Sequence, residues 1–307
     1  MPIPTFESLQ SKALELGWDD VGITAAKIPE EDIQFYLDWL SKGLHGSLGY
    51  MENRLRTDPE TLFPGAKSAI IFVSYYKQEK IPFPQKGGLI ASYARGRDYH
   101  HIHRKRLKAF IRWLENEIGE SGIAKGFSDS TPILEKALAV QAGLGWFGKN
   151  TLLIHRRFGT FTLLSGVLTT IPFETPVIPL RLPRCGSCTR CMDACPTQAL
   201  INPYTLDAAR CLSYHLIESK NPIPQSIQEK NPGYIFGCDI CQDVCPHNSR
   251  KSASDHEEFS PARGMGISLT LDAIHHLEEH PEELFGTPLQ RKGVGGLKEN
   301  LMTLKNT

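Results

Sequence analysis

Cysteines are the residues in this sequence whose type and spacing point most directly to chemistry. Eight occur among 307 residues, and four of them lie in the stretch CGSCTRCMDACP, at Cys185, Cys188, Cys191 and Cys195. A proline follows the last of the four. In this CxxCxxCxxxCP spacing, three neighbouring thiolates bind three irons of one 4Fe-4S cluster, and the fourth thiolate binds a second cluster. The stretch therefore predicts a pair of iron-sulfur clusters.

A second run, CDICQDVCP, supplies three more thiols, and these match only the last three positions of the same spacing. Cys211 is the one cysteine left to complete the set. Because the fourth thiolate of each run binds the other cluster, the eight cysteines divide into two groups of four. We predict one cluster bound by Cys185, Cys188, Cys191 and Cys245, and a second bound by Cys195, Cys211, Cys238 and Cys241.

Two other uses of cysteine compete with this assignment. CxxC pairs also occur in tetrahedral zinc sites, but zinc does not require the CxxxCP ending in both runs. Disulfide frameworks are typical of oxidising compartments, and the N-terminal stretch MPIPTFESLQ lacks the features of a signal peptide. We therefore expect metal ligands in a cytoplasmic protein.

The composition is that of a globular protein with a sizeable core, since 40% of the residues are hydrophobic and 22% are charged. Basic and acidic residues number 34 each, so no global charge favours a nucleic acid or a membrane. No apolar run approaches the ~20 residues that span a bilayer. We expect no membrane attachment and a monomeric state, and any nucleic acid must bind a local patch.

One such basic patch is RGRDYHHIHRKRLKAFIRW, residues 95–113. Phosphate contact and a solvated basic helix face are both open interpretations of this stretch. Its histidines, His100, His101 and His103, are less favoured candidates for metal ligands, because a helix surface explains them equally well.

The hydrophobic pattern predicts alternating helices and strands up to about residue 175. Helices are expected at 5–17, 30–42 and 99–119, and another over ILEKALAVQAG after Thr131 and Pro132. DDVGITA, GAKSAIIFVSYY and LIASYARG are expected to be strands, and the continuous apolar run in the second predicts burial on both faces. TLLIHRRFGTFTLLSGVLTTI is expected to form two strands joined as a hairpin through RRFG.

A change in composition divides the chain after these elements. PFETPVIPLRLPR, residues 172–184, contains four prolines, and every cysteine follows it. We therefore predict three parts: 1–175, 176–250 with the cysteines, and a helical tail at 251–307.

Outside the cysteines, several blocks resemble one known family. HGSLGYM (45–51), YARGRDYH (93–100) and DSTPILEKALAVQAGLGWFGKNTLLI (129–154), in this order with both cysteine runs, are similar to epoxyqueuosine reductases. The likeness covers about residues 5 to 250 and continues weakly to 305. It implies an α+β fold, in which a mixed sheet flanked by helices forms a cobalamin-binding catalytic domain beside a ferredoxin-like domain with two 4Fe-4S clusters. The tail at 251–307 would pack on both domains and lacks the longer repeat extension of many relatives.

The resemblance also implies a reaction, partners and site residues. The reaction is reduction of epoxyqueuosine to queuosine at the tRNA wobble position, the final step of queuosine synthesis, with a flavodoxin or ferredoxin as electron donor. Asp129 matches the family's general acid, although DSTP also suits a helix cap or turn. The implied cobalamin contacts are Arg56, Tyr93, Asp129, Gly145, Trp146, Lys149, Asn150 and Thr151, and the candidate contacts with the tRNA anticodon arm are Arg190, Arg210, Tyr214 and His215.

Glycines at 143, 145 and 148 would let the backbone approach a large flat ligand. No DxHxxG stretch is present, so we expect no protein histidine on cobalt. A corrinoid reductive dehalogenase and a non-enzymatic two-cluster electron carrier are the alternative functions. The presence of DSTP and the lack of an export signal argue against a dehalogenase. Corrinoid binding would exclude an electron carrier.

Overall fold

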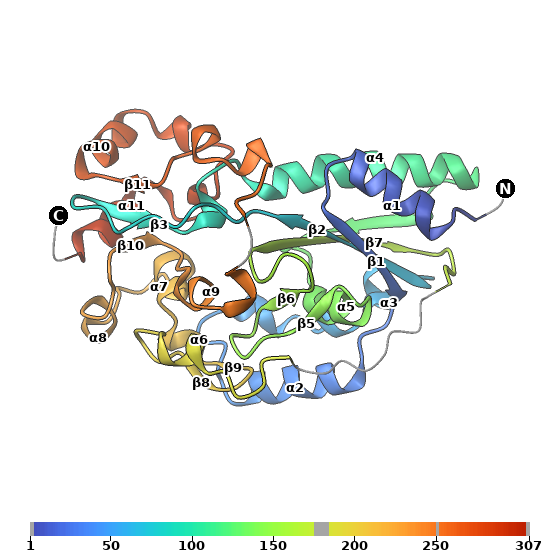
Figure 1. Ribbon diagram of the computed structural model, residues 1–307, viewed down its shortest axis with the longest axis horizontal. Coiled ribbons are helices and arrows are strands. Elements are labelled where there is room, and N and C mark those ends of the chain that lie inside the picture. The colour runs from blue at the N-terminus through green and yellow to red at the C-terminus, as the bar shows by residue number, and fades with distance from the viewer. Residues whose placement is uncertain (1–2, 175–183, 250–251, 305–307) are drawn as a thin grey trace. The chain divides into compact units, whose positions relative to one another are not determined.

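The computed structural model describes residues 3–174, 184–249 and 252–304, which divide into two compact units (Figure 1). Unit 1 comprises 1–43, 49–75 and 100–186, and unit 2 comprises 44–48, 76–99 and 187–307. Most of the predicted connector at 172–184 lies outside the described residues. The expected division differs in two ways: residues 76–99 belong with the cysteine segment, and so does the expected tail.

A four-stranded antiparallel sheet with the order β1-β2-β7-β4 forms the centre of unit 1. Its strands are β1 (Asp20–Ala25), β2 (Ser68–Tyr75), β7 (Thr162–Thr169) and β4 (Ala124–Phe127). The helices of this unit are α1 (Phe6–Glu15), α2 (Glu30–Ser41), α3 (Pro59–Leu62), α4 (Tyr99–Ile118, from its second residue on) and α5 (Glu135–Gln141), with the 3-10 turns η1 (Gly49–Glu52) and η2 (Arg54–Thr57).

Strand β2 is buried along its whole length, as its apolar sequence predicts. One face, with Phe72, packs against α1 and α4, and the other, with Ile71, packs against α5 (Figure 1). Trp18 stacks on Phe72 with ring centroids 4.0 Å apart, and Phe110 of α4 meets Phe72 edge-on at 4.8 Å. Burying both faces of one strand fixes the sheet between its helices.

The expected hairpin through RRFG is wrong. Strand β6 (Leu153–His155) pairs with β5 (Gly145–Phe147), whereas β7 pairs over eight residues with β2. The chain turns between them, and a bridge from His155 to Gly159 closes that turn. The strand-like run after RRFG forms β7, which is long enough to pair with β2 over eight residues. It therefore joins the central sheet, between β2 and β4.

Unit 2 contains a mixed sheet with the order β10-β3-β11. Strand β3 (Gly88–Ile90) runs parallel to β10 (Tyr234–Phe236) and antiparallel to β11 (Ser268–Leu269). This pairing explains why residues 76–99 and the C-terminal segment belong to one unit with the cysteines. The other elements are the hairpin β8 (Leu200–Asn202) and β9 (Thr205–Leu206), and the helices α6 (Arg190–Asp193), α7 (Leu212–Ile217), α8 (Gln225–Gln228), α9 (Ile240–Asp243), α10 (Leu271–Glu279) and α11 (Gly293–Met302).

Helices and sheets thus mix in each unit, which confirms the α+β class. Within the described ranges, no helix has both the length and the apolar character needed to cross a membrane.

Candidate functional site

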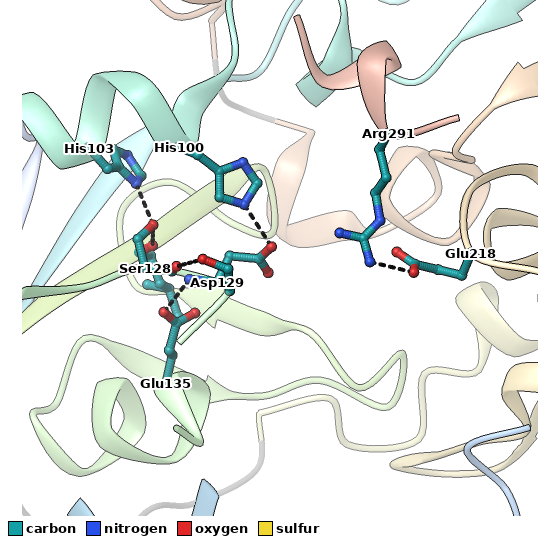
Figure 2. Close-up of polar contacts among 9 residues, drawn as sticks. His100, His103, Ser128, Asp129, Glu135, Glu218 and Arg291 are labelled. Carbon is teal, nitrogen blue, oxygen red and sulfur yellow. Dashed lines mark hydrogen bonds and ion pairs between the residues drawn. The ribbon is translucent and has the colours of Figure 1, made fainter. Parts of the chain in front are cut away.

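Asp129 lies in the exposed turn between β4 and α5, where the DSTP stretch placed it. Its φ of 45° is in the left-handed region, which aspartate tolerates better than most residues. The side chain is 53% exposed, and its Oδ2 lies 2.9 Å from Nε2 of His100 on α4. Its backbone N–H donates to Oε1 of Glu135 at 2.6 Å (Figure 2). The carboxyl group is therefore accessible and held in place from two sides.

A buried histidine supports the same turn from α4. His103 is fully buried, and one of its ring nitrogens contacts Ser128 Oγ at 3.2 Å (Figure 2). Its other ring nitrogen contacts Ser74 Oγ at 3.1 Å. Arg106, one turn further along α4, donates to Ser74 Oγ at 3.3 Å. Polar partners of this kind are expected for a buried histidine. His103 therefore ties α4 to the sheet and to the turn, which argues against a metal-ligand role.

Glu135, the first residue of α5, was not among the expected site residues. Desolvation raises the pKa of Glu135 to about 8, and repulsion from the nearby Asp129 carboxylate adds to the increase. The hydrogen bond from Asp129 and the charges of Arg56 and His100 act in the opposite direction. The sequence signal at this position is an acidic residue in the first turn of a helix, which ordinarily indicates only a favourable helix-dipole interaction.

The glycine-rich segment 143–151 contains β5 and the turn that leads to β6. A Cβ at Gly145 would lie 2.2 Å from the Ile154 carbonyl oxygen, and one at Gly148 would lie 2.4 Å from Asn150 Oδ1. These glycines therefore allow neighbouring segments of the protein to approach one another closely. Thr151 has φ 65° and retains some exposure, as does Lys149, whose Nζ donates to the Gly186 carbonyl at 2.7 Å.

The remaining candidate cobalamin contacts divide by burial and by unit. Arg56, Trp146 and Asn150 are buried in unit 1. The Arg56 Nε donates to the Tyr50 carbonyl at 3.3 Å, and its guanidinium lies over the Tyr50 ring. Tyr93 lies in unit 2, where it packs against Tyr99.

Five of the cysteines lie close enough together in unit 2 to influence one another's charge. Burial raises the pKa of the Cys241 thiol, and repulsion from Cys238, Cys211, Cys195 and Cys191 raises it further. Burial also raises the pKa of Cys238 and of Cys211. Cys195, Cys211, Cys238 and Cys241 are the predicted ligands of the second cluster, and Cys191 is a predicted ligand of the first. Bound iron would supply the positive charge that favours their thiolate form, so this donor set suits a 4Fe-4S cluster.

The two cysteine runs adopt matching local structures. Cys191 lies in the one-turn helix α6 and Cys241 lies in the one-turn helix α9, and these helices pack against each other. Asp239, beside Cys238, is buried and accepts hydrogen bonds from Ser92 N at 2.7 Å and Ser92 Oγ at 2.8 Å. This contact fastens the second run to the segment that follows β3.

For the first cluster, Cys188, Cys191 and Cys245 lie in unit 2, and Cys185 is in the last segment of unit 1. All eight cysteines lie within the described residues, and none of them forms a disulfide. The grouping of these four remains a prediction.

The four candidate tRNA contacts also divide by exposure. Arg190 and Arg210 are exposed. Tyr214 is buried, with its hydroxyl 2.6 Å from Ser47 Oγ, and His215 is buried, with Nε2 2.8 Å from the Ala209 carbonyl. Burial lowers the pKa of His215. The structure thus gives Tyr214 and His215 packing roles in α7, and it leaves the two arginines available at the surface.

Comparison with known proteins agrees with the predicted two-cluster segment and with the resemblance to epoxyqueuosine reductases. Residues 184–248 match the model of a 4Fe-4S double cluster binding domain, and residues 56–130 match that of epoxyqueuosine reductase QueG, DUF1730. The curated epoxyqueuosine reductase of Leadbetterella byssophila is 40% identical, over 97% of this chain and 98% of its own length. That of Pseudomonas aeruginosa is 36% identical, over 98% of this chain and 84% of its own length.

Solved structures of the same family have the same fold. A crystal structure of epoxyqueuosine reductase with an epoxyqueuosine-modified tRNA-Tyr stem loop matches with a TM-score of 0.84 at 29% identity, over 97% of this chain and 80% of the other. The Streptococcus thermophilus enzyme also gives 0.84, at 27% identity, over 96% and 79% of the two chains. With relatives this similar over nearly its whole length, this chain belongs to the epoxyqueuosine reductase family.

Proposed function

We propose that this protein reduces epoxyqueuosine to queuosine at the wobble position of tRNA, with Asp129 as the proton donor. The observation that carries the proposal is the position of Asp129: an accessible carboxyl group in a restrained turn, within a chain that is similar to epoxyqueuosine reductases over nearly its full length. A structure of one such relative contains an epoxyqueuosine-modified tRNA stem loop.

The overall reaction removes the epoxide oxygen as water and consumes two electrons and two protons. When bound, cobalamin would supply two-electron chemistry at cobalt, and the two 4Fe-4S clusters would supply single electrons. The thiols of Cys195, Cys211, Cys238 and Cys241 would hold one cluster. Lys149 and Thr151 retain some exposure and are candidate corrin contacts.

Asp129 in the turn and His100 on α4 together perform the proton transfer. With its Nε2 protonated, His100 donates to Asp129 Oδ2, so the proton to be transferred is carried on Oδ1. Asp129 delivers this proton to the departing oxygen, and its 53% exposure allows solvent to replace the proton afterwards. General acid catalysis of this kind contributes about 10²–10⁴-fold to a rate. Arg190 and Arg210 would contact phosphates of the anticodon arm.

The test is anaerobic reconstitution with iron, sulfide and a corrinoid, followed by turnover of a stem-loop RNA carrying epoxyqueuosine with a reduced flavodoxin or ferredoxin. Nucleoside mass spectrometry would detect loss of the oxygen. Asp129→Asn should keep both cofactors and lower turnover by about 10²-fold or more. Asp272→Asn, an exposed change on α10, is the matched control and should match the wild type. Wild-type turnover by D129N would remove Asp129 from the mechanism, and iron uptake without corrinoid uptake would favour an electron carrier.

A further inference from the structure

We infer that Glu135 is a positioning residue, whose side chain holds the Asp129 turn in the conformation that presents the acid to its substrate. This inference rests on the proposed function of Asp129 and deepens it. The contact that carries it is the hydrogen bond from the Asp129 backbone N–H to Glu135 Oε1, at 2.6 Å (Figure 2).

The two ends of this contact differ in how firmly they are held. Asp129 and Ser130 are exposed, and Asp129 has the positive φ that non-glycine residues adopt at a cost. Glu135 begins α5, whose next turn, from Ala137 to Val140, is buried in the core. The Glu135 side chain thus attaches an exposed, strained turn to a rigid helix. Catalytic groups need such support, because small displacements reduce rates strongly.

The base of α5 is itself anchored. The Leu134 N–H donates to the Arg56 carbonyl at 3.1 Å, which joins the start of the helix to η2. The charged groups that act on Glu135 are Asp129 from the turn, Arg56 from η2 and His100 from α4. His100 contacts the Asp129 carboxylate, and Glu135 contacts the Asp129 backbone, so the two residues restrain different parts of the same amino acid.

A related enzyme shows that such a turn can move. One structure of the Bacillus subtilis epoxyqueuosine reductase, 28% identical to this chain, has its catalytic aspartate loop swung out of the active site. In this chain, loss of the Glu135 hydrogen bond would release the backbone N–H of Asp129.

The experiment compares two substitutions at this position. Glu135→Gln keeps an acceptor oxygen, and Glu135→Ala removes it. Glu117→Ala, an exposed change on α4, is the control. We expect E135A to lower kcat by about 10–100-fold per bound cofactor, with little change in KM for the stem-loop RNA, and we expect E135Q to stay within about threefold of the wild type.

Amide hydrogen exchange provides a readout that needs neither cofactor nor substrate. The peptide containing Asp129 should exchange faster in E135A, and at the wild-type rate in E135Q and E117A. Wild-type kcat in E135A, equal losses in E135A and E135Q, or unchanged exchange in E135A would each overturn the inference. A wild-type protein that leaves epoxyqueuosine unchanged would instead refute the proposed function, and the exchange measurement would still decide whether Glu135 holds the turn.

Discussion

Substitution of Asn300 by alanine should loosen the binding site of the second cluster. Asn300 is buried on α11, and its amide Nδ2 donates to the Leu216 carbonyl at 2.9 Å and to the Ile235 carbonyl at 2.8 Å. Leu216 lies on α7, which follows Cys211, and Ile235 lies on β10, which precedes Cys238. One side chain therefore joins the two segments that carry predicted ligands of the same cluster.

The expected cost follows from these two hydrogen bonds. Each contributes about 1 kcal/mol net, and a buried carbonyl left without a donor costs about 1–3 kcal/mol. We expect N300A to destabilise unit 2 by about 2–4 kcal/mol, which lowers its melting temperature by about 5–12 °C. Loss of iron to a chelator should accelerate as well, because transient separation of α7 and β10 would expose the cluster.

The assay is thermal unfolding of the reconstituted protein under anaerobic conditions, followed by cluster absorption, with the rate of iron release measured separately. Glu299→Ala is the matched control, since Glu299 is the exposed neighbour on the same helix, and its effect should stay within about 0.5 kcal/mol. An N300A protein that melts within about 1 °C of the wild type would refute the reasoning.

Two further predictions concern the cysteines and Glu135. Cys195→Ser should reduce the iron content from about eight to about four per chain, because one cluster loses a thiolate while the other keeps four; retention of eight irons would contradict the role of Cys195 as a cluster ligand. Glu135, with a pKa raised from 4.5 to about 8, is protonated in the fold where the unfolded chain would be ionised, so its contribution to stability falls as pH rises through this window. E135Q lacks this loss, so its free energy of unfolding should rise relative to the wild type by about 1–2 kcal/mol between about pH 6 and pH 8. This figure is smaller than the full pKa shift would give, because the side chain is partly exposed. A stability difference that is constant with pH would contradict the raised pKa.

The two-cluster segment could be predicted from the sequence because cluster ligation imposes a local spacing. Residues of each run are separated by two or three positions, and a turn of helix places them, as in α6 and α9. The buried strand β2 was predictable for a similar reason, since its composition records burial on both faces. Such features depend on neighbouring residues in the chain.

The features that the sequence did not reveal depend on distant partners. The run after RRFG has the composition of a hairpin strand, but its partners are β2 and β4. The helix containing ILEKALAVQAG begins at Glu135, because Ile133 and Leu134 lead out of the turn that holds Asp129. No local pattern distinguishes a first-turn glutamate that stabilises a helix from one that accepts a hydrogen bond from residue 129.

The C-terminal stretch LKEN shows that neighbouring residues can have opposite environments that the sequence does not distinguish. In the structure, the asparagine faces the interior of unit 2 and binds two backbone carbonyls, whereas Glu299 faces solvent. Because the buried amide of Asn300 joins the segment after Cys211 to the segment before Cys238, we expect its substitution to displace both predicted ligands, and substitution of Glu299 to leave them in place. Loss of RNA affinity in an Asn300 variant would then follow from a loosened cluster segment, and the iron-release rate would change in the same variant even with no RNA present.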